Sequence, residues 1–126
     1  MSIRTVIVDN DKELLDKLSG ILREIGQIDL VGCFEHPADV LAVAEREPVD
    51  LVFSDVVMPD ISGITLAARL SELPAPPRVV LLSDIPGLSL KAWNIKAFAF
   101  IPKPYTKGDI AEIVKQYEHL APAVPA

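Results

Sequence analysis

The sequence predicts an α/β domain built on a five-stranded parallel sheet, and three observations support this prediction. Five short apolar runs alternate with five segments that suit helices, the pattern of parallel strands joined by helical crossovers. The runs are apolar almost throughout, as strands are when both faces of a sheet are covered. All but the second run end in polar residues, and in such a sheet these ends share one rim. The 126 residues, half of them hydrophobic, suffice for one domain.

The first half of the chain contains three of the predicted strands. They are expected over 5–8, 28–34 and 49–55, where apolar and β-branched residues gather. Between the first two strands, apolar residues recur at helical spacing over 12–25, which predicts an amphipathic helix. A second helix is expected to open at Pro37, because proline is favoured in a first helical turn.

The second half alternates in the same way but is less regular after residue 84. A helix is expected over 64–73, and strands are expected over 78–83 and 98–101. Between those strands, Pro86-Gly87 leaves room only for a short fourth helix over 88–95.

The last predicted helix begins at a capping box. Thr106 is the expected cap, and Asp109 is expected to reach back to the backbone N–H of that cap. Apolar residues from Ile110 onward then line one helical face. We expect one domain over residues 1–120, followed at 121–126 by a proline- and alanine-rich tail or the start of a removed linker.

Composition excludes some classes of function. The net charge of −6 argues against non-specific nucleic-acid binding, which needs a basic surface. No apolar run reaches the length of a membrane span, and Met1 to Arg4 do not resemble a signal peptide, so we expect a cytoplasmic location. Cys33 is the only cysteine, which rules out an intrachain disulfide, and we expect it to be a small buried hydrophobe.

The polar strand ends form a set with a specific chemistry. Asp9-Asn10-Asp11 follow the first strand, and Asp55, Ser83 and Lys103 stand at the ends of the third, fourth and fifth strands. A hard cation such as Mg²⁺ takes oxygen ligands, and a phosphoryl group takes a cation, a lysine and a hydroxyl donor. The set therefore predicts phosphoryl chemistry at a carboxylate, with an aspartyl-phosphate as intermediate or product.

The sequence resembles the receiver domain of bacterial two-component response regulators, of the single-domain type. The pieces that carry the resemblance are Val8-Asp9-Asn10-Asp11, Ser54-Asp55-Val56-Val57-Met58-Pro59 with Gly63, Leu82-Ser83, and Lys103-Pro104-Tyr105. Together they extend over nearly the whole chain, each after a predicted strand. The resemblance implies a flavodoxin-like, doubly wound (βα)5 fold with the strand order 2-1-3-4-5.

The resemblance also implies roles for individual residues. Asp55 would be the phosphoacceptor, and Lys103 would pair with the phosphoryl group. Ser83 would be the switch hydroxyl, and Phe100 the aromatic side chain that turns inward with it. The peptide bond between Lys103 and Pro104 is expected to be cis, for which proline lowers the cost to about 0.5–1 kcal/mol.

The implied cofactor is Mg²⁺, held by Asp9, Asn10, Asp55 and the backbone carbonyl of Val57. Asn10 departs from the family pattern, because the family has a second acid there. A neutral amide should bind the cation more weakly, and Asp11 compensates only if its side chain points back toward the site.

A second departure concerns the approach of the phosphoryl donor. Asp84 follows the switch serine, where the family usually has a small residue. Its negative charge lies close to the incoming phosphoryl group and is expected to repel the donor or narrow its access.

The resemblance implies a function in two-component phosphorelay signalling. A histidine kinase or a phosphotransfer protein would phosphorylate Asp55, and the domain would then switch a protein-binding face made of the fourth helix, the fifth strand and the last helix. We expect no enzymatic activity beyond Mg²⁺-dependent self-phosphorylation and dephosphorylation. We also expect no direct contact with nucleic acid or membrane. The chain would be a monomer or a phosphorylation-dependent dimer.

Two other functions stay open. Asn10 and Asp84 favour a degenerate receiver that binds a protein partner without being phosphorylated. The opening of the chain also resembles the D-x-D motif of haloacid-dehalogenase-type phosphatases, with Asp9 as nucleophile and Asp11 as acid–base. That alternative leaves Asp55 without a role.

Overall fold

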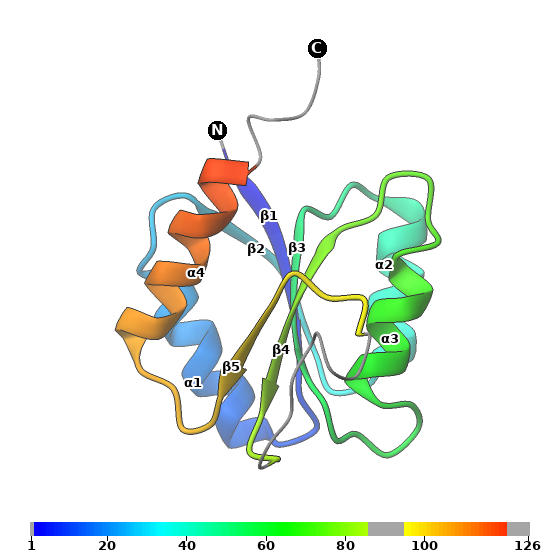
Figure 1. Cartoon of the computed structure of the whole chain (residues 1–126), viewed down its shortest axis with the longest axis horizontal. Helices are drawn as coiled ribbons and strands as arrows, with labels where there is room; N and C mark the ends of the chain where they lie inside the picture. The colour runs from blue at the N-terminus through cyan, green and yellow to red at the C-terminus, as the bar shows by residue number, and fades with distance from the viewer. Residues whose placement is uncertain (1, 86–94, 121–126) are drawn as a thin grey trace.

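Over residues 2–85 and 95–120, which the computed structural model describes, strands and helices alternate along most of the chain (Figure 1). The elements are β1 (Ile3–Val8), α1 (Lys12–Arg23), β2 (Ile28–Phe34), α2 (Pro37–Arg46), β3 (Leu51–Asp55), α3 (Gly63–Leu70), β4 (Arg78–Ser83), β5 (Ala99–Pro102) and α4 (Lys107–Leu120). The fourth helix predicted over 88–95 and the tail predicted at 121–126 lie outside the described residues, except that residue 95 is described and is not helical.

The five strands form one parallel sheet in the order β2-β1-β3-β4-β5, which confirms the predicted fold and strand order. The register aligns the carboxyl ends of neighbouring strands. Val8 pairs with Ser54 across β1 and β3, Asp55 pairs with Leu82, and Ser83 pairs with Pro102. The residues at and just after these ends therefore meet at one rim of the sheet.

Helices cover both faces of the sheet, α1 and α4 on one and α2 and α3 on the other (Figure 1). Alternate residues of each strand face the two layers, because side chains along a strand point to opposite sides. One core contains Ile7, Phe53 and Leu82 with Leu18 and Ile110, and the other contains Val6, Val52 and Leu81 with Val40 and Leu66. Burial on both faces explains the continuous apolar runs in the sequence.

Where a predicted boundary differs from the structure, the difference is one to three residues. The first helix ends at Arg23 rather than at residue 25, and α3 ends at Leu70 rather than at 73. The predicted capping box is confirmed, since Thr106 N–H donates to Asp109 Oδ2 at 2.8 Å and Asp109 N–H donates to Thr106 Oγ1 at 3.1 Å. The peptide bond between Lys103 and Pro104 is cis, as the resemblance implied.

The expectation that Cys33 is buried is wrong, because its side chain is exposed. Cys33 lies in β2, an edge strand of the sheet, which pairs with another strand on one side only. Among the described residues, no helix is long and apolar enough to cross a membrane.

Candidate functional site

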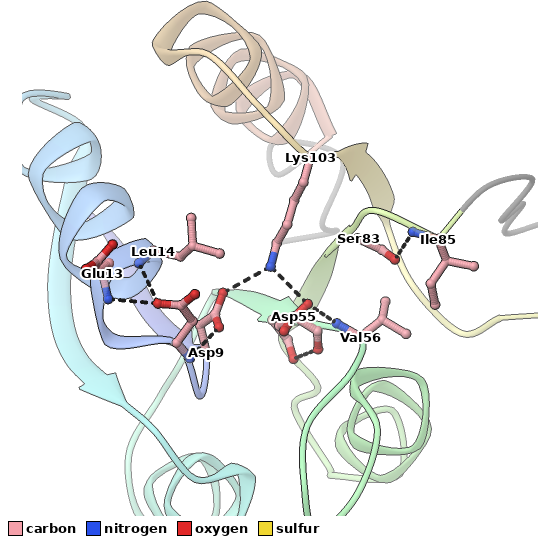
Figure 2. Close-up of polar contacts among 10 residues, drawn as sticks. Asp9, Glu13, Leu14, Asp55, Val56, Ser83, Ile85 and Lys103 are labelled. Carbon is pink, nitrogen blue, oxygen red and sulfur yellow. Dashed lines mark hydrogen bonds and ion pairs between the residues drawn. The ribbon is translucent and has the colours of Figure 1, made fainter.

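Three predicted site residues meet at the carboxyl rim of the sheet (Figure 2). Lys103, directly after β5, places its ammonium Nζ 3.2 Å from Asp55 Oδ1 and 3.3 Å from Asp9 Oδ2. Asp55 ends β3, and Asp9 directly follows β1. The side chains of both carboxylates are almost fully buried, with 12% and 3% of their surface exposed. One ammonium thus joins two buried acids that lie 46 residues apart in the chain.

The two oxygens of Asp55 differ in their partners. Oδ1 accepts a hydrogen bond from the backbone N–H of Val56 at 2.9 Å, in addition to its contact with Lys103. No donor among the described residues reaches Oδ2. The carboxylate is therefore oriented through one oxygen, and the other is left to form a bond.

Gly63 brings the start of α3 close to the end of β3. A Cβ at this position would lie 2.1 Å from the carbonyl oxygen of Asp55, so only glycine fits. The Gly63 N–H donates to the Val56 carbonyl at 2.8 Å, and the neighbouring Ser62 caps α3 by accepting the N–H of Thr65 at 3.1 Å. These contacts fix the backbone that carries Asp55.

Burial raises the pKa of two groups near the rim, Asp9 and Tyr105. Burial raises the pKa of Asp9, Asp55 raises it further, and the Asp11 N–H and Lys103 counteract part of the rise. The pKa of Tyr105 rises to about 12, mainly through burial and further through the negative charges of Asp9 and Asp55. The phenol of Tyr105 therefore lies within the electric field of the two acids.

The other predicted site residues lie around the trio of Lys103, Asp55 and Asp9, and among the described residues no side-chain hydrogen bond or ion pair joins them to these three charged groups. The buried Ser83 hydroxyl accepts the N–H of Ile85 at 2.9 Å (Figure 2). Phe100 is half-buried against the α2–α3 core, and the side chain of Val57 is 62% exposed. Asn10 is exposed directly beside Asp9.

Asp11 does not turn back toward the site. Its Oδ1 accepts the N–H of Glu13 at 3.0 Å and that of Leu14 at 3.4 Å, so it is the N-cap of α1. The carboxylate therefore does not replace the acid missing at Asn10. The same geometry counts against the phosphatase alternative, which needs Asp11 as an acid–base partner of Asp9.

The donor atoms at the rim fit a hard divalent cation. Asp9 and Asp55 offer carboxylate oxygens, and two carboxylates with one ammonium leave one net negative charge. Mg²⁺ is commonly held by one or two carboxylates, with waters and phosphate oxygens completing its shell. No group of three or more acids, histidines or cysteines that could hold a metal occurs in the part of the chain that the structure describes. Further protein ligands to such a cation would be neutral oxygens such as that of Asn10.

A cavity of about 820 Å³ opens at the opposite rim of the sheet. Its lining includes Val49, Arg78, Phe98 and Tyr117, at the amino ends of β3, β4 and β5 and on α4. It contains none of the trio, so we place the chemistry at the carboxyl rim.

Two contacts of the site were not predicted from the sequence. The Val56 N–H orients Asp55, and Lys17 of α1 contacts Tyr105. A backbone N–H leaves no trace in residue identity, and an exposed lysine in an amphipathic helix looks like any solvated one. Tyr105 belongs to the Lys103-Pro104-Tyr105 motif, but the sequence predicts no role for its side chain.

Comparisons with a family model and with known proteins show which sequences this chain is similar to. The family model described as "Response regulator receiver domain" matches residues 5–115. The chain is 28% identical over 116 residues to the Transcriptional regulatory protein YpdB of Escherichia coli K12, and 30% identical over 118 residues to the Positive alginate biosynthesis regulatory protein of Pseudomonas aeruginosa. These matches cover 92% and 90% of the chain but 48% and 46% of the relatives, so the chain spans about half their length.

Among solved structures, the response regulatory domain of protein mrkE from Klebsiella pneumoniae is similar over its full length. It is 26% identical, with a TM-score of 0.80, and the match covers 92% of this chain and 98% of that domain.

Proposed function

The chain belongs to the family of response regulator receiver domains, and on this basis we propose that it accepts a phosphoryl group on Asp55. The observation that carries the proposal is the ammonium of Lys103, within 3.3 Å of both buried carboxylates at one rim. We infer that Asp55 is the acceptor because, among the described residues, donors reach only its Oδ1, whereas Asp9 receives donors on both oxygens.

In the proposed step, Asp55 Oδ2 forms a bond to phosphorus. The donor's bond breaks at the same centre: P–N in a phosphohistidine of a kinase or phosphotransfer protein, P–O in acetyl phosphate. The leaving imidazole or acetate takes the electron pair. The ammonium of Lys103 then pairs with a phosphoryl oxygen and stabilises the charge that develops on the group.

The cofactor we propose is Mg²⁺. Asp9, Asp55, the amide oxygen of Asn10 and the carbonyl of Val57 would hold it. When bound, the cation neutralises charge on the phosphoryl oxygens. The chain's own residues supply the nucleophile, its orientation and the lysine charge.

Phosphorylation would be read out through the end of β4. The Ser83 hydroxyl accepts one hydrogen bond and keeps its own proton, which it would donate to a phosphoryl oxygen. Because the Ser83 hydroxyl accepts the Ile85 N–H, its movement would shift the backbone at Ile85. The ring of Phe100 would then turn inward. The proposed result is a population shift of a protein-binding face that includes β5 and α4, in a cytoplasmic pathway.

A second candidate is a receiver that binds its partner without phosphorylation. Asn10 favours it, because an amide stands where the family has a second acid and Asp11 is engaged as a helix cap. This candidate keeps the fold and the binding face and omits the chemistry.

One experiment distinguishes the two candidates. The protein is incubated with acetyl phosphate and Mg²⁺, and intact mass is measured. We expect a gain of one phosphoryl group in the wild type and no gain in Asp55→Asn. The matched control is Asp60→Asn, which changes an exposed acid in the following loop and should leave the gain intact.

The result that contradicts phosphorylation is no gain in the wild type or in Asn10→Asp at high Mg²⁺ concentration. Native circular dichroism of each variant confirms that the domain is folded. In that case the phosphorylation-independent receiver is the better description.

A further inference from the structure

Lys17, a residue of α1 with no role so far, makes two contacts with the segment that carries the site lysine. Its ammonium donates to the backbone carbonyl of Tyr105 at 3.3 Å. The same ammonium lies 4.7 Å from the centroid of the Tyr105 ring, within cation–π distance. One exposed side chain thus holds both the backbone and the ring of Tyr105 against α1.

Tyr105 is a firm attachment point. Its side chain is 3% exposed and packs into the core beneath α1 and α4, with Leu15, Leu18 and Ile110. It stands two residues after Lys103 and directly before the capping box of α4. A shift of the backbone at Tyr105 therefore reaches Lys103 through only one intervening residue.

The backbone at Lys103 has one other fixed point nearby. The Lys103 N–H donates to the Ser83 carbonyl at 2.8 Å, which holds the segment to β4 on its other side. The strand side is thus fixed by Ser83 and the helix side by Lys17. Between them, the Lys103 ammonium must stay within about 3.5 Å of two separate acids to hold both.

We propose that Lys17 is a positioning residue for Lys103: by fixing Tyr105 against α1, it sets where the Lys103 ammonium stands relative to Asp55. Loss of the Lys17 ammonium leaves the Tyr105 carbonyl to solvent and removes two of the contacts that hold the segment against α1, while the Tyr105 ring keeps its packing in the core. The expected effect of Lys17 on the labelling rate rests on the proposed phosphoacceptor function. The effect of Lys17 on the position of the Lys103 ammonium does not require phosphorylation.

Three variants test the proposal. Lys17→Met keeps the alkyl stem and removes the ammonium, Lys17→Arg keeps a cation that can donate and stack, and Lys12→Met removes another exposed lysine of α1 as the matched control. Two readouts are used: the rate of acetyl phosphate labelling at saturating Mg²⁺, and the ¹H–¹⁵N signal of the Lys103 ammonium, assigned with Lys103→Arg.

We expect Lys17→Met to lower the labelling rate about tenfold, less than the roughly 100-fold that a full misplacement of about 1 Å can cost. The Lys103 ammonium signal should broaden or move in the same variant. Lys17→Arg should restore both, and Lys12→Met should change neither. Urea midpoints of the Met variants should agree, which separates positioning from a loss of stability.

An unchanged Lys103 signal in Lys17→Met overturns the proposal, whatever happens to the rate. An altered signal with failed rescue by Lys17→Arg also overturns it. If the wild type takes up no phosphoryl group, the proposed function fails, and the ammonium signal alone still decides the role of Lys17.

Discussion

At the scale of single residues, the site is a balance of burial against pairing. Asp9 and Asp55 are buried, and their removal from water is costly unless each negative charge is compensated. Lys103 compensates both with a single ammonium, which leaves one negative charge in excess. That excess negative charge would favour a divalent cation, and it would be larger with an acid in place of the Asn10 amide.

Asn10→Asp is expected to raise the Mg²⁺ affinity about tenfold, because a second full negative charge beside Asp9 strengthens the attraction for a cation. Isothermal titration with MgCl₂ measures the change. Gln116→Glu, on the exposed surface of α4, adds the same charge away from the rim and should have little effect. Equal affinities in wild type and Asn10→Asp would show that the amide is not a ligand.

Tyr105 makes the stability of the domain sensitive to alkaline pH. Its pKa is about 12 in the folded protein and about 10 in an unfolded chain, so the folded state binds the phenolic proton more tightly. The stabilising contribution is complete below pH 10 and is lost as the pH rises toward 12.

Urea unfolding measured from about pH 8 to about pH 11 tests this dependence on pH. Because lysines also titrate in this range, the wild type is compared with Tyr105→Phe. The free energy of unfolding should fall less above about pH 10 in Tyr105→Phe than in the wild type. The difference between the two proteins isolates the phenol from the lysines. Parallel curves would contradict the raised pKa.

At the scale of elements, the site depends on how each helix and strand ends. Asp11 caps α1, Ser62 caps α3, and Thr106 with Asp109 caps α4. Of the two acids that follow β1, Asp11 caps α1, whereas Asp9 turns to Lys103. One acidic tripeptide therefore serves a structural and a chemical purpose through different residues.

Gly63→Ala is expected to destabilise the domain by about 1–3 kcal/mol, since the new Cβ would lie 2.1 Å from a backbone oxygen that cannot move without shifting β3. It should also slow phosphorylation of Asp55. The matched control is Gly20→Ala within α1, where a Cβ meets nothing within 4 Å. There the exchange should stabilise by about 0.5–1 kcal/mol, and urea unfolding of both variants gives the comparison.

At the scale of the whole molecule, the sheet separates two apolar cores that have no side chain in common among the described residues. Each strand contributes alternate residues to both, so the cores are linked through the backbone of the sheet. The domain should therefore unfold in one cooperative step even though a substitution in one core leaves the packing of the other unchanged.

Substitutions in the two cores should be additive. Ile110→Val in the α1–α4 core should cost about 0.5–1.5 kcal/mol, and Leu66→Ala in the α2–α3 core about 2–5 kcal/mol. In the double variant the losses should sum to within about 0.5 kcal/mol, as measured by urea unfolding. A larger departure, or two separate transitions, would mean that the cores do not behave as described.

The sequence by itself determined the fold class, the approximate elements and the positions of Asp9, Asp55, Ser83 and Lys103 at strand ends. Apolar periodicity and turn residues are local properties, so they can be read along the chain. The strand order and the proposed roles of these residues came from motifs spread over the chain, whose order and spacing match a family. Local patterns were less able to place helix ends, where boundaries shifted by up to three residues.

Only the tertiary structure decided which atoms meet. Register and the neighbours of each strand decide the engagement of Asp11, the contact of Lys17 with Tyr105, the exposure of Cys33, and which oxygen of Asp55 the described donors reach. Lys17 and Tyr105 lie 88 residues apart, and nothing in either segment alone indicates that they touch. Contacts between distant segments arise from the packing of helices on the sheet, which residue identity constrains only collectively.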